Sequence, residues 1–336
     1  MKAAILEELN KPLVLRELKL IPLTVGQVLV RILVSGICGS QLHEIQGFKG
    51  NGKFLPHLMG HEGCGIVEEV GPGVSTVKVG DKVVMHWRIG SGIESGFPSY
   101  FLNDRLISSG KINTLAEKAI VSENRITTIP EDTDPEFAAL LGCSLATALG
   151  IIENQSNLRF GETVVVIGCG GVGLNLIAAA RLRGASVIHA LDVVKTKKEL
   201  AIKQGASTFS SSISDLPSNI DLVLDTSGNP EIIASAFSLL GDDGRIIMVG
   251  QPNPGQKLTI PSGLGMFAGN GQEIRATQGG AFNPQADIPR YLRLFESKQL
   301  PIDSLITHRF KLNEINDAFE NLKSGLAGRI MIKISD

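Results

Sequence analysis

Residues 163–173 read TVVVIGCGGVG, and this stretch determines the fold of the second half of the chain. Residues 163–167 are all β-branched and predict a buried strand. The glycines after them follow the order G-x-G-x-x-G, and an Ala-rich helical pattern comes next. Between a strand and a helix, the first glycine permits a tight turn, the second leaves room for a pyrophosphate, and the third lets the helix pack on the strand. The stretch therefore predicts a dinucleotide site at Gly168, Gly170, Gly171, Val172 and Gly173.

An acidic residue follows the next predicted strand at the position expected of a ribose-binding carboxylate. Asp192 comes 19 residues after Gly173, at the end of residues 187–191. Its carboxylate can accept hydrogen bonds from ribose hydroxyls and would repel a 2′-phosphate, so we expect NAD rather than NADP. Lys197 is also expected near the ribose, although a lysine at the start of a helix is commonly a solvated surface residue. Cys169 is interpreted as a small buried filler.

Strand and helix patterns alternate from residue 162 onward. Further strands are predicted at residues 187–191, 221–225 and 245–249, and helices at residues 174–182, 200–204 and 232–240. This alternation is typical of βαβ units around a doubly wound parallel sheet, which is a Rossmann domain. Nearer the N-terminus, short β-type runs broken by glycines predict a separate β-rich, barrel-like domain, with strands at residues 28–34, 64–70 and 81–85. The tail adds a helix at residues 315–323 and a strand at residues 328–334, so the fold class is α/β with two domains.

Length and charge narrow the function. A chain of 336 residues favours two domains, because a single core stops growing at about 250–300 residues. The 32 Lys and Arg residues balance 34 Asp and Glu residues, which argues against binding to nucleic acid or to a membrane surface. Apolar runs are too short to span a bilayer and acidic residues follow closely on the N-terminus, so we expect a cytoplasmic protein. Four cysteines are too few for a disulfide scaffold.

Three residues of metal-binding type are scattered over the first domain. Cys38 lies in GICGS, His61 in GHEG and Cys143 in LGCS. No pair has the close spacing of a zinc finger, so the fold must bring the three together. Two thiolates and one imidazole leave a fourth tetrahedral position open, as at a catalytic zinc. On spacing alone, a buried Cys38 and a hydrogen-bonded core His61 are the commoner alternatives.

With these motifs the chain resembles the zinc-dependent medium-chain alcohol dehydrogenases over essentially its whole length. The GHEG signature continues as Gly65, Val67, residues 70–71 and residues 79–81. The resemblance implies a GroES-like catalytic domain at residues 1–143 and 281–336, a Rossmann NAD-binding domain at residues 144–280, and an active site in the cleft. It also implies a homodimer or homotetramer.

The resemblance makes Cys38, His61 and Cys143 the ligands of one catalytic zinc and Glu62 a carboxylate that coordinates transiently. In such an enzyme, zinc polarises a small-molecule alcohol as a Lewis acid, and NAD accepts the hydride to leave an aldehyde or ketone. Many relatives hold a second, structural zinc with four closely spaced cysteines. Residues 88–142 contain no cysteine, so we expect no structural zinc here.

The resemblance also assigns residues around the reacting alcohol and the cofactor. Ser40 stands where a hydroxyl hydrogen-bonds the alcohol, and His43 stands where a histidine passes the proton to solvent. Arg329 matches an arginine at the cofactor phosphates. Trp87 matches an aromatic residue of the substrate pocket, and Gln251 stands near the expected nicotinamide site.

Four positions depart from the family pattern. Gln41 replaces the usual aspartate, and its amide is expected to accept a hydrogen bond from the imidazole of His61. Gly39 replaces a phosphate-binding cation. His86 and Arg88 flank Trp87 and, as pocket donors, would suit a polyol or a sugar-type secondary alcohol.

Two other functions stay open. One is a zinc-free quinone or enone reductase on the same fold, which would not need the two cysteines. The other is a non-catalytic nucleotide-binding protein, which would tolerate loss of Ser40 and His43.

Overall fold

The computed structural model describes residues 1–50, 52–260, 270–300 and 304–335. The chain divides into two compact units. The first unit comprises Met1–Ala146, Asn283–Arg293 and Ile306–Asp336, and the second comprises Thr147–Phe282 and Leu294–Leu305.

The first unit is β-rich. Its strands are β1 (Lys2–Leu6), β2 (Val14–Glu17), β3 (Gln27–Ile37), β4 (His57–Leu58), β5 (Glu62–Val70), β6 (Lys82–His86), β7 (Ser99–Leu102), β8 (Arg105–Ser109), β9 (Lys118–Ser122), β10 (Ile126–Ile129), β17 (Ile306–Lys311) and β18 (Arg329–Lys333). They form one sheet in the order β2-β1-β4-β8-β7 and a second in the order β10-β6-β5-β3-β18-β17, in which β9 also pairs with β3. The long strand β3 is therefore central, because it pairs with β5, β9 and β18.

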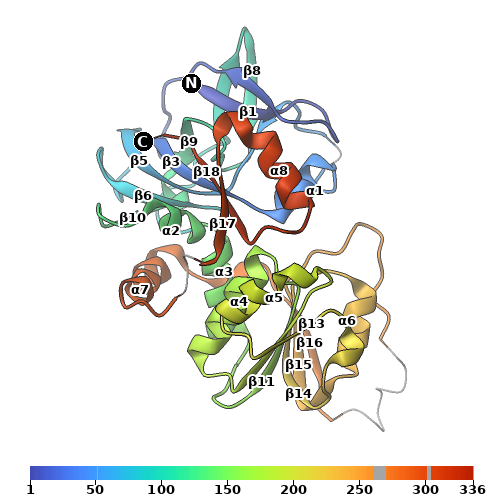
Figure 1. Ribbon diagram of the computed structural model, residues 1–336. Helices are drawn as coiled ribbons and strands as arrows, with labels where there is room; N and C mark the ends of the chain where they lie inside the picture. Colours follow the sequence, from blue (N-terminus) through green and yellow to red (C-terminus); the bar gives the residue numbers. More distant parts are fainter. Residues whose placement is uncertain (51, 261–269, 301–303, 336) are drawn as a thin grey trace. The chain divides into compact units, whose positions relative to one another are not determined.

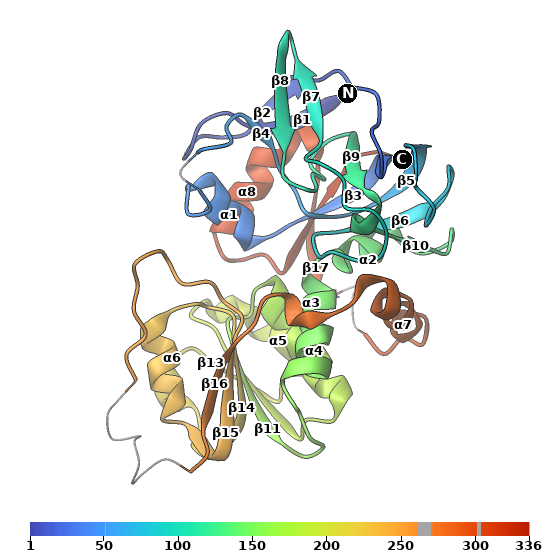
Figure 2. The same ribbon diagram turned by 180° about the vertical axis from the view of Figure 1, so that it is seen from behind.

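Short helices cover the sheets of the first unit. They are α1 (Gly39–Ile45), α2 (Pro135–Leu140), α8 (Ile315–Lys323) and the 3-10 turns η1 (Glu123–Arg125) and η8 (Leu312–Glu314). Helix α8 packs against α1 in both views of the ribbon (Figures 1 and 2). Ile315 and Phe319 of α8 are buried with Ile37, at the end of β3, and Ile45 of α1, which anchors the segment that begins at Cys38.

The second unit is a parallel sheet with helices on both faces. Its strands are β11 (Thr163–Ile167), β12 (Val187–Leu191), β13 (Thr208–Ser210), β14 (Ile220–Asp225), β15 (Leu240–Met248) and β16 (Glu273–Ala276). Its helices are α4 (Gly171–Arg183), α5 (Lys198–Lys203) and α6 (Pro230–Phe237), with the shorter turns η2 (Ile151–Gln155), η3 (Lys195–Lys197), η4 (Ile213–Asp215) and η6 (Gly279–Ala281). Figure 1 shows α4 and α5 on one face of the sheet and α6 on the other. The order β13-β12-β11-β14-β15-β16 confirms the doubly wound sheet and the predicted fold class.

Register places the functional loops of this sheet at one edge. Ile167, the last residue of β11, is paired with Leu191 of β12 and with Asp225 of β14. Because the three parallel strands end level with one another, the glycine loop and Asp192 leave the sheet side by side. Ligands of open parallel sheets bind at this carboxyl edge.

Helices α3 (Ser144–Gly150) and α7 (Pro284–Glu296) each run from one unit into the other along the chain. The expected boundary placed all of residues 281–336 in the first domain, whereas Leu294–Leu305 belongs to the second unit. One contact of this segment with the second unit is the hydrogen bond of 2.8 Å that the Ser304 hydroxyl accepts from Gln204 at the end of α5.

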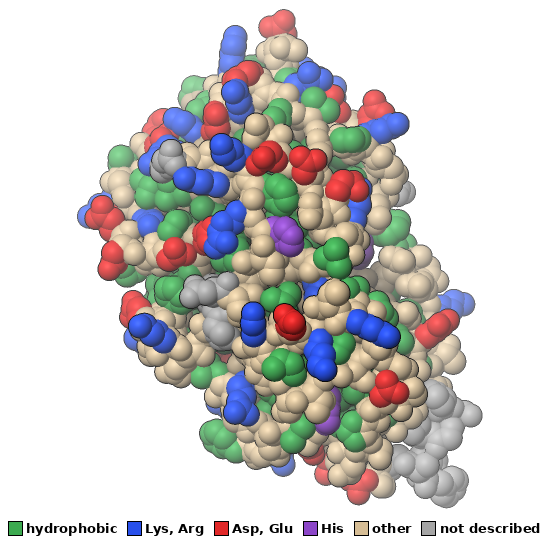
Figure 3. Space-filling view, viewed as in Figure 1, with side chains coloured by type: hydrophobic (Ala, Val, Ile, Leu, Met, Phe, Trp, Pro, Cys, Tyr) green, Lys and Arg blue, Asp and Glu red, His purple; other side chains and the backbone are tan. Residues whose placement is uncertain are grey.

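Within the described part of the chain, no helix has the length and apolar character needed to cross a bilayer. On the face shown in Figure 3, Lys and Arg side chains are interspersed with Asp and Glu side chains. That mixture fits the balanced charge of the sequence.

Candidate functional site

The three predicted metal ligands come from separate elements of the first unit. Cys38 is the N-cap of α1, directly after β3. His61 directly precedes β5, and Cys143 lies in the turn between α2 and α3. Gly60, before His61, has a φ of +103° and no room for a side chain, since a Cβ would lie 2.4 Å from the Thr114 hydroxyl. A glycine is therefore required to turn His61 toward the two cysteines.

The structure brings the three ligands together. One sulfur or nitrogen atom from each of Cys38, His61 and Cys143 lies within 4.8 Å of the other two. A hydrogen bond from the Cys143 thiol, with the positive charges of His61 and Arg329, holds the pKa of Cys38 well below its usual range. The same Cys38 sulfur, together with burial, raises the pKa of Cys143. Two sulfurs and one imidazole nitrogen at this spacing are the donor set that zinc binds in a tetrahedron.

A buried ion pair stands beside the cluster. Glu62 is fully buried, and one of its carboxylate oxygens accepts a hydrogen bond from Arg329, which is 3% exposed. The other oxygen accepts the backbone N–H of Ser144 at 3.2 Å. Gly36 leaves the space for this pair, because a Cβ there would lie 2.5 Å from the Glu62 carboxylate. Glu62 is therefore next to the ligands and held by other partners.

Gln41 differs from its expected role. Its amide oxygen accepts the backbone N–H of Cys38 at 2.8 Å, and we find no such bond from His61 among the described contacts. The reason is its position at N3 of α1, where a Gln side chain turns back to the N-cap as in a capping box. The amide nitrogen of Gln41 is buried and has no hydrogen-bond partner in the described structure.

The predicted proton-relay residues, Ser40 and His43, lie on α1, and Cys38 is the N-cap of this helix. Ser40 and His43 are three residues apart and so share one side of the helix. Burial and the positive charge of Lys49 lower the pKa of His43, which favours the neutral imidazole that can accept a proton. The His43 ring lies 5.6 Å from that of Phe48, which limits its orientation.

Trp87 follows β6 and is half-buried against the core of the first unit. A hydrogen bond from its indole to the Cys143 sulfur partly offsets the rise in the pKa of that thiol. The expectation that His86 supplies a pocket donor is wrong. His86 is fully buried, with Nδ1 bonded to the Arg88 carbonyl and Nε2 to the Thr127 hydroxyl. In a strand of alternating faces, the residue before Trp87 points into the core.

The glycine loop of the second unit has the geometry that its sequence predicts. Gly168 has a φ of +87°, and a Cβ on Gly173 would lie 1.7 Å from the Gly168 carbonyl oxygen. Gly170 has open space instead, with no atom within 4 Å of a Cβ. Residues Gly171 and Val172 open α4, whose first turn carries no acidic side chain and whose N-cap makes no side-chain bond. Its free N–H groups therefore suit a pyrophosphate.

Asp192 is fixed beside the loop. Its carboxylate accepts the backbone N–H of Cys169 at 2.7 Å and that of Val194 at 2.8 Å, one on each oxygen. Each oxygen keeps a further lone pair for a ribose hydroxyl. Lys197 is 2% exposed, so it is not a solvated surface lysine, and burial lowers its pKa against the opposing charge of Asp192. Cys169 is a fully buried filler as expected, and burial raises its pKa to about 12.

Gln251 lies just beyond β15 in the second unit and is exposed. A Cβ on Gly228 would lie 2.7 Å from the Gln251 carbonyl, so the two backbones run in contact. Asp225 fixes the Gly228 turn by accepting its N–H at 3.0 Å. Gln251 is thus held at the same edge of the sheet as Asp225.

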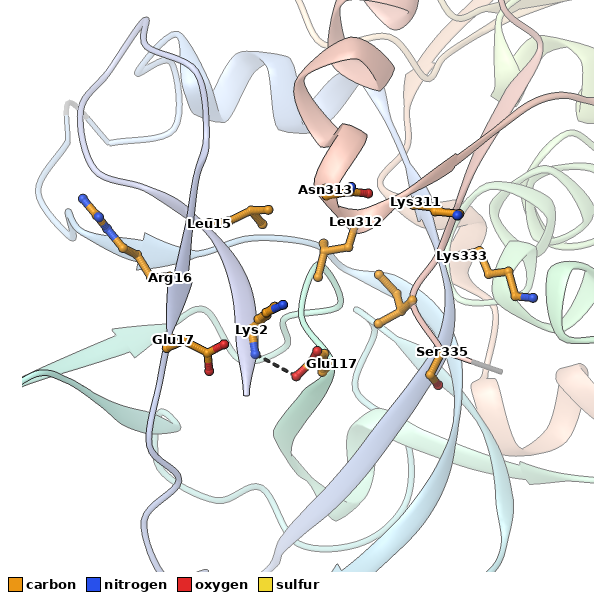
Figure 4. A pocket seen from close by; sticks show the side chains of 11 residues that line it. Lys2, Leu15, Arg16, Glu17, Glu117, Lys311, Leu312, Asn313, Lys333 and Ser335 are labelled. Carbon is orange, nitrogen blue, oxygen red and sulfur yellow. Dashed lines mark hydrogen bonds between the residues drawn. The ribbon is translucent and has the colours of Figure 1, made fainter.

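A hollow of about 560 Å³ lies elsewhere on the first unit. It is lined by residues of β1, β2, β17 and β18, and Figure 4 shows Lys333 and Arg16 directed away from each other there. None of the metal ligands lines it. We therefore do not assign the catalytic site to this hollow.

Comparison with known proteins gives the family. Residues 24–131 match the alcohol dehydrogenase GroES-like domain, and residues 171–297 match the zinc-binding dehydrogenase domain. The chain is 30% identical to an NDMA-dependent alcohol dehydrogenase of Amycolatopsis methanolica, with 96% of each chain covered. It is also 30% identical to alcohol dehydrogenase 6 of Peromyscus maniculatus over 98% of this chain and 97% of the other.

The chain belongs to the zinc-type medium-chain alcohol dehydrogenase family. The crystal structure of benzyl alcohol dehydrogenase from Acinetobacter calcoaceticus agrees, with a TM-score of 0.88, 26% identity and 99% of both chains covered. Alcohol dehydrogenase TADH from Thermus sp. ATN1 has a TM-score of 0.82 at 26% identity, with both chains covered fully. As a member of this alcohol dehydrogenase family, the protein is an oxidoreductase that transfers a hydride between an alcohol and NAD.

Two features of the alcohol dehydrogenase site have no signal in the sequence. The pairing of Glu62 with Arg329 joins residues 267 positions apart. The contact of Arg125 with the Trp87 carbonyl depends on a three-residue turn without a motif.

Proposed function

We propose that the protein oxidises a small-molecule alcohol with NAD at one catalytic zinc held by Cys38, His61 and Cys143. The observation that carries this proposal is the convergence of the three donor atoms within 4.8 Å of one another. A protein that needed no metal would not have to bring two thiols and an imidazole together. This argues against the zinc-free reductase.

Zinc, when bound, supplies a Lewis acid for the alcohol oxygen, and NAD supplies the hydride acceptor. Cys38, His61 and Cys143 would hold the zinc and leave a place at the metal for the alcohol oxygen. Ser40, two residues after Cys38 on α1, is proposed to accept the hydroxyl proton of the alcohol. His43 is proposed to pass that proton to solvent, and its lowered pKa keeps the imidazole able to accept it.

Glu62 and Arg329 are proposed to tune the charge at the metal ligands. Arg329 acts on the Cys38 sulfur and lowers its pKa, while its charge is compensated by Glu62. Transient coordination by Glu62 requires its carboxylate to leave Arg329. A role for Arg329 at the cofactor phosphates remains part of the proposal.

We propose NAD as the preferred cofactor because Asp192 has lone pairs for ribose hydroxyls beside an open Gly170. Replacing one charge-assisted hydrogen bond costs about 1.4 kcal/mol or more, which is about tenfold in affinity. Asp192→Asn is therefore expected to lower the preference for NAD over NADP by about tenfold. Specificity constants for both cofactors measure this, and an unchanged ratio would contradict the role of Asp192.

Fewer residues support a polyol or sugar-type substrate than the sequence alone indicated. With His86 in the core, a polyol or sugar-type secondary alcohol is favoured only by the polar side chains of Arg88 and Gln251. The NDMA-dependent and benzyl alcohol dehydrogenases make primary and aromatic alcohols necessary members of any substrate panel. A single zinc per chain, a homodimer or homotetramer, and a cytoplasmic location also stay predictions.

The test combines metal analysis with turnover. Wild type is expected to hold one zinc per chain and to reduce NAD with at least one alcohol in a panel of alkanols, aromatic alcohols, polyols and sugars. Cys143→Ser is expected to lose the zinc and the activity. Cys64→Ser is the matched control, because Cys64 is a fully buried cysteine of β5 outside the cluster. Metal-free active protein would favour the reductase, and metal-bound protein inactive on every alcohol would favour the non-catalytic alternative.

A further inference from the structure

The segment that carries Trp87 lacks regular structure. Residues 87–98 connect β6 to β7 and form no strand or helix. Gly90, Gly92 and Gly96 lie within it, and Gly92 has a φ of +107°. A glycine-rich connection of this kind has many accessible conformations, so its position must come from contacts with the rest of the first unit.

Three consecutive residues supply several of those contacts, and Gln285, Ser122 and Lys111 add others at Ser91 and Ser95. Glu123, Asn124 and Arg125 form the turn η1 and are all buried, at 0%, 2% and 8% exposure. The Asn124 carbonyl accepts the N–H of Gly90 at 2.8 Å. The Glu123 carboxylate accepts the N–H of Ile93 at 2.8 Å. The turn therefore binds the middle of the segment through its first two residues.

Arg125 binds the first residue of the segment, Trp87, and also Glu94. Its Nη1 donates to the carbonyl of Trp87. Its Nε and Nη2 donate to the two carboxylate oxygens of Glu94 at 3.3 and 3.1 Å. Lys111 adds a second cation 3.2 Å from Glu94, and although burial raises the pKa of Glu94, these partners hold it below its usual value. The planar guanidinium thus connects Trp87 to Glu94 in one rigid group, which a lysine cannot do.

The position of Trp87 is important because of what its side chain touches. One side of it packs on the buried cluster around β3 and β6. Arg88 lies 5.6 Å from its ring centroid. The antiparallel register that pairs His86 with Glu62 also brings Trp87, one residue after His86, level with His61, one residue before Glu62 and one of the proposed metal ligands. A backbone shift at Trp87 would therefore move the wall next to the metal.

We propose that Arg125 is a positioning residue for the reaction: by holding the Trp87 carbonyl and Glu94 together, it fixes the indole beside the proposed metal ligands and sets which alcohols the site accepts by size. This inference rests on the proposed function, since it takes Trp87 as a wall of the alcohol pocket. A fixed wall discriminates between alcohols of different bulk, and a loose wall discriminates less.

The sequence provides a direct probe, because Trp87 is the only tryptophan. Its emission maximum and its quenching by acrylamide report the position of this one ring without turnover. Arg125→Met and the near-isosteric Glu94→Gln are expected to shift the emission to longer wavelength and to increase quenching. Arg125→Lys, which keeps one donor and the charge, is expected to give an intermediate result. Arg309→Met is the matched control, since Arg309 makes a bidentate pair with Glu136 on the surface of the same unit.

Selectivity gives the second readout. Across a series from ethanol to benzyl alcohol, the ratio of the highest to the lowest kcat/KM is expected to fall about tenfold in Arg125→Met. The change is expected mainly in KM, because the metal ligands and α1 are untouched. Glu94→Gln carries the same test if Arg125→Met does not fold.

Two results overturn the inference. One is unchanged emission, quenching and selectivity in both Arg125→Met and Glu94→Gln. The other is a shifted emission with no change of alcohol ranking in either Arg125→Met or Trp87→Leu, because Trp87 is then no wall of the pocket. Failure of the proposed function is distinct: wild type then oxidises no alcohol, while the fluorescence of the variants still decides whether Arg125 positions Trp87.

Discussion

Glu62 and Arg329 meet in the interior of the first unit although 267 positions separate them in the chain. Both side chains are almost completely shielded from water. Removing one partner of a buried pair leaves an uncompensated charge, which costs more than the pair itself contributes. Substitution of one partner of this pair is therefore expected to lower the free energy of unfolding strongly.

Arg329→Met is expected to lower the free energy of unfolding of the first unit by about 3–5 kcal/mol. The double variant Glu62→Gln with Arg329→Met is expected to recover most of that loss, because no charge is left unpaired. Urea titration followed by Trp87 fluorescence measures both, since Trp87 belongs to this unit. Arg309→Met should cost no more than about 1 kcal/mol, because its pair is exposed. Equal losses in the single and double variants would contradict this account.

His86 gives the first unit a pH dependence. Burial lowers its pKa from 6.5 to about 4, so the folded state excludes the proton that the unfolded state binds. The stability is fully present above pH 6.5 and is lost as the pH falls from 6.5 to about 4. A shift of this size corresponds to on the order of 3 kcal/mol. We expect His86→Gln to remove this slope, while His308→Gln on β17 leaves it, in unfolding curves measured across that range. A wild-type slope that persists in His86→Gln would assign it to other groups.

The convergence of the three proposed metal ligands was predictable, whereas the contacts of their neighbours were not. Cys38, His61 and Cys143 belong to the few residue types that bind zinc and stand in motifs, so their type and context identify them. Gln41 has a side chain with several possible partners, and only the helix geometry selects the Cys38 N–H. His86 lies in the core, because alternation along β6 turns it inward and its two ring nitrogens find partners there.

At the scale of elements, the βαβ pattern predicted the second unit closely. The strands expected at residues 163–167 and 187–191 have those bounds in the structure. The helix expected to continue to residue 240 ends at Phe237, because Leu240 pairs with Ile220 at the start of β15. The apolar pattern continues through this junction, so periodicity alone does not locate it.

Substitutions at two glycines of the loop between β11 and α4 are expected to have different effects, one on folding and the other on NADH binding. Gly173→Ala places a Cβ 1.7 Å from the Gly168 carbonyl oxygen. It is therefore expected to displace α4 and to lower the free energy of unfolding of the second unit by about 3 kcal/mol. Gly170→Ala meets no atom within 4 Å and should fold normally. It is nevertheless expected to weaken NADH binding, since its methyl group enters the space proposed for the pyrophosphate. Circular dichroism melting and NADH titration distinguish the two, and equal melting of both variants would contradict the steric argument.

At the scale of the whole molecule, the two chemical tasks belong to different units. The proposed metal ligands all lie in the first unit, whereas the glycine loop and Asp192 lie in the second. Removal of the metal with a chelator is therefore expected to abolish alcohol oxidation but to leave the Kd for NADH within about threefold. It should also lower the melting temperature reported by Trp87, because the metal links three elements of that unit. Loss of NADH binding on chelation would contradict the separation of tasks.

The place of β18 in its sheet has a consequence for biosynthesis. This strand lies between β3 and β17 and carries Arg329, yet it comes after every other described strand in sequence. On the ribosome, residues 34–37 of β3 keep an unpaired edge until β18 emerges, because β9 pairs only with residues 27–31, and such edges are prone to pairing with other chains. The second unit is complete at Leu305, before the first unit can close. The second unit is thus expected to fold first on the nascent chain, before Arg329 has been synthesised and can pair with Glu62.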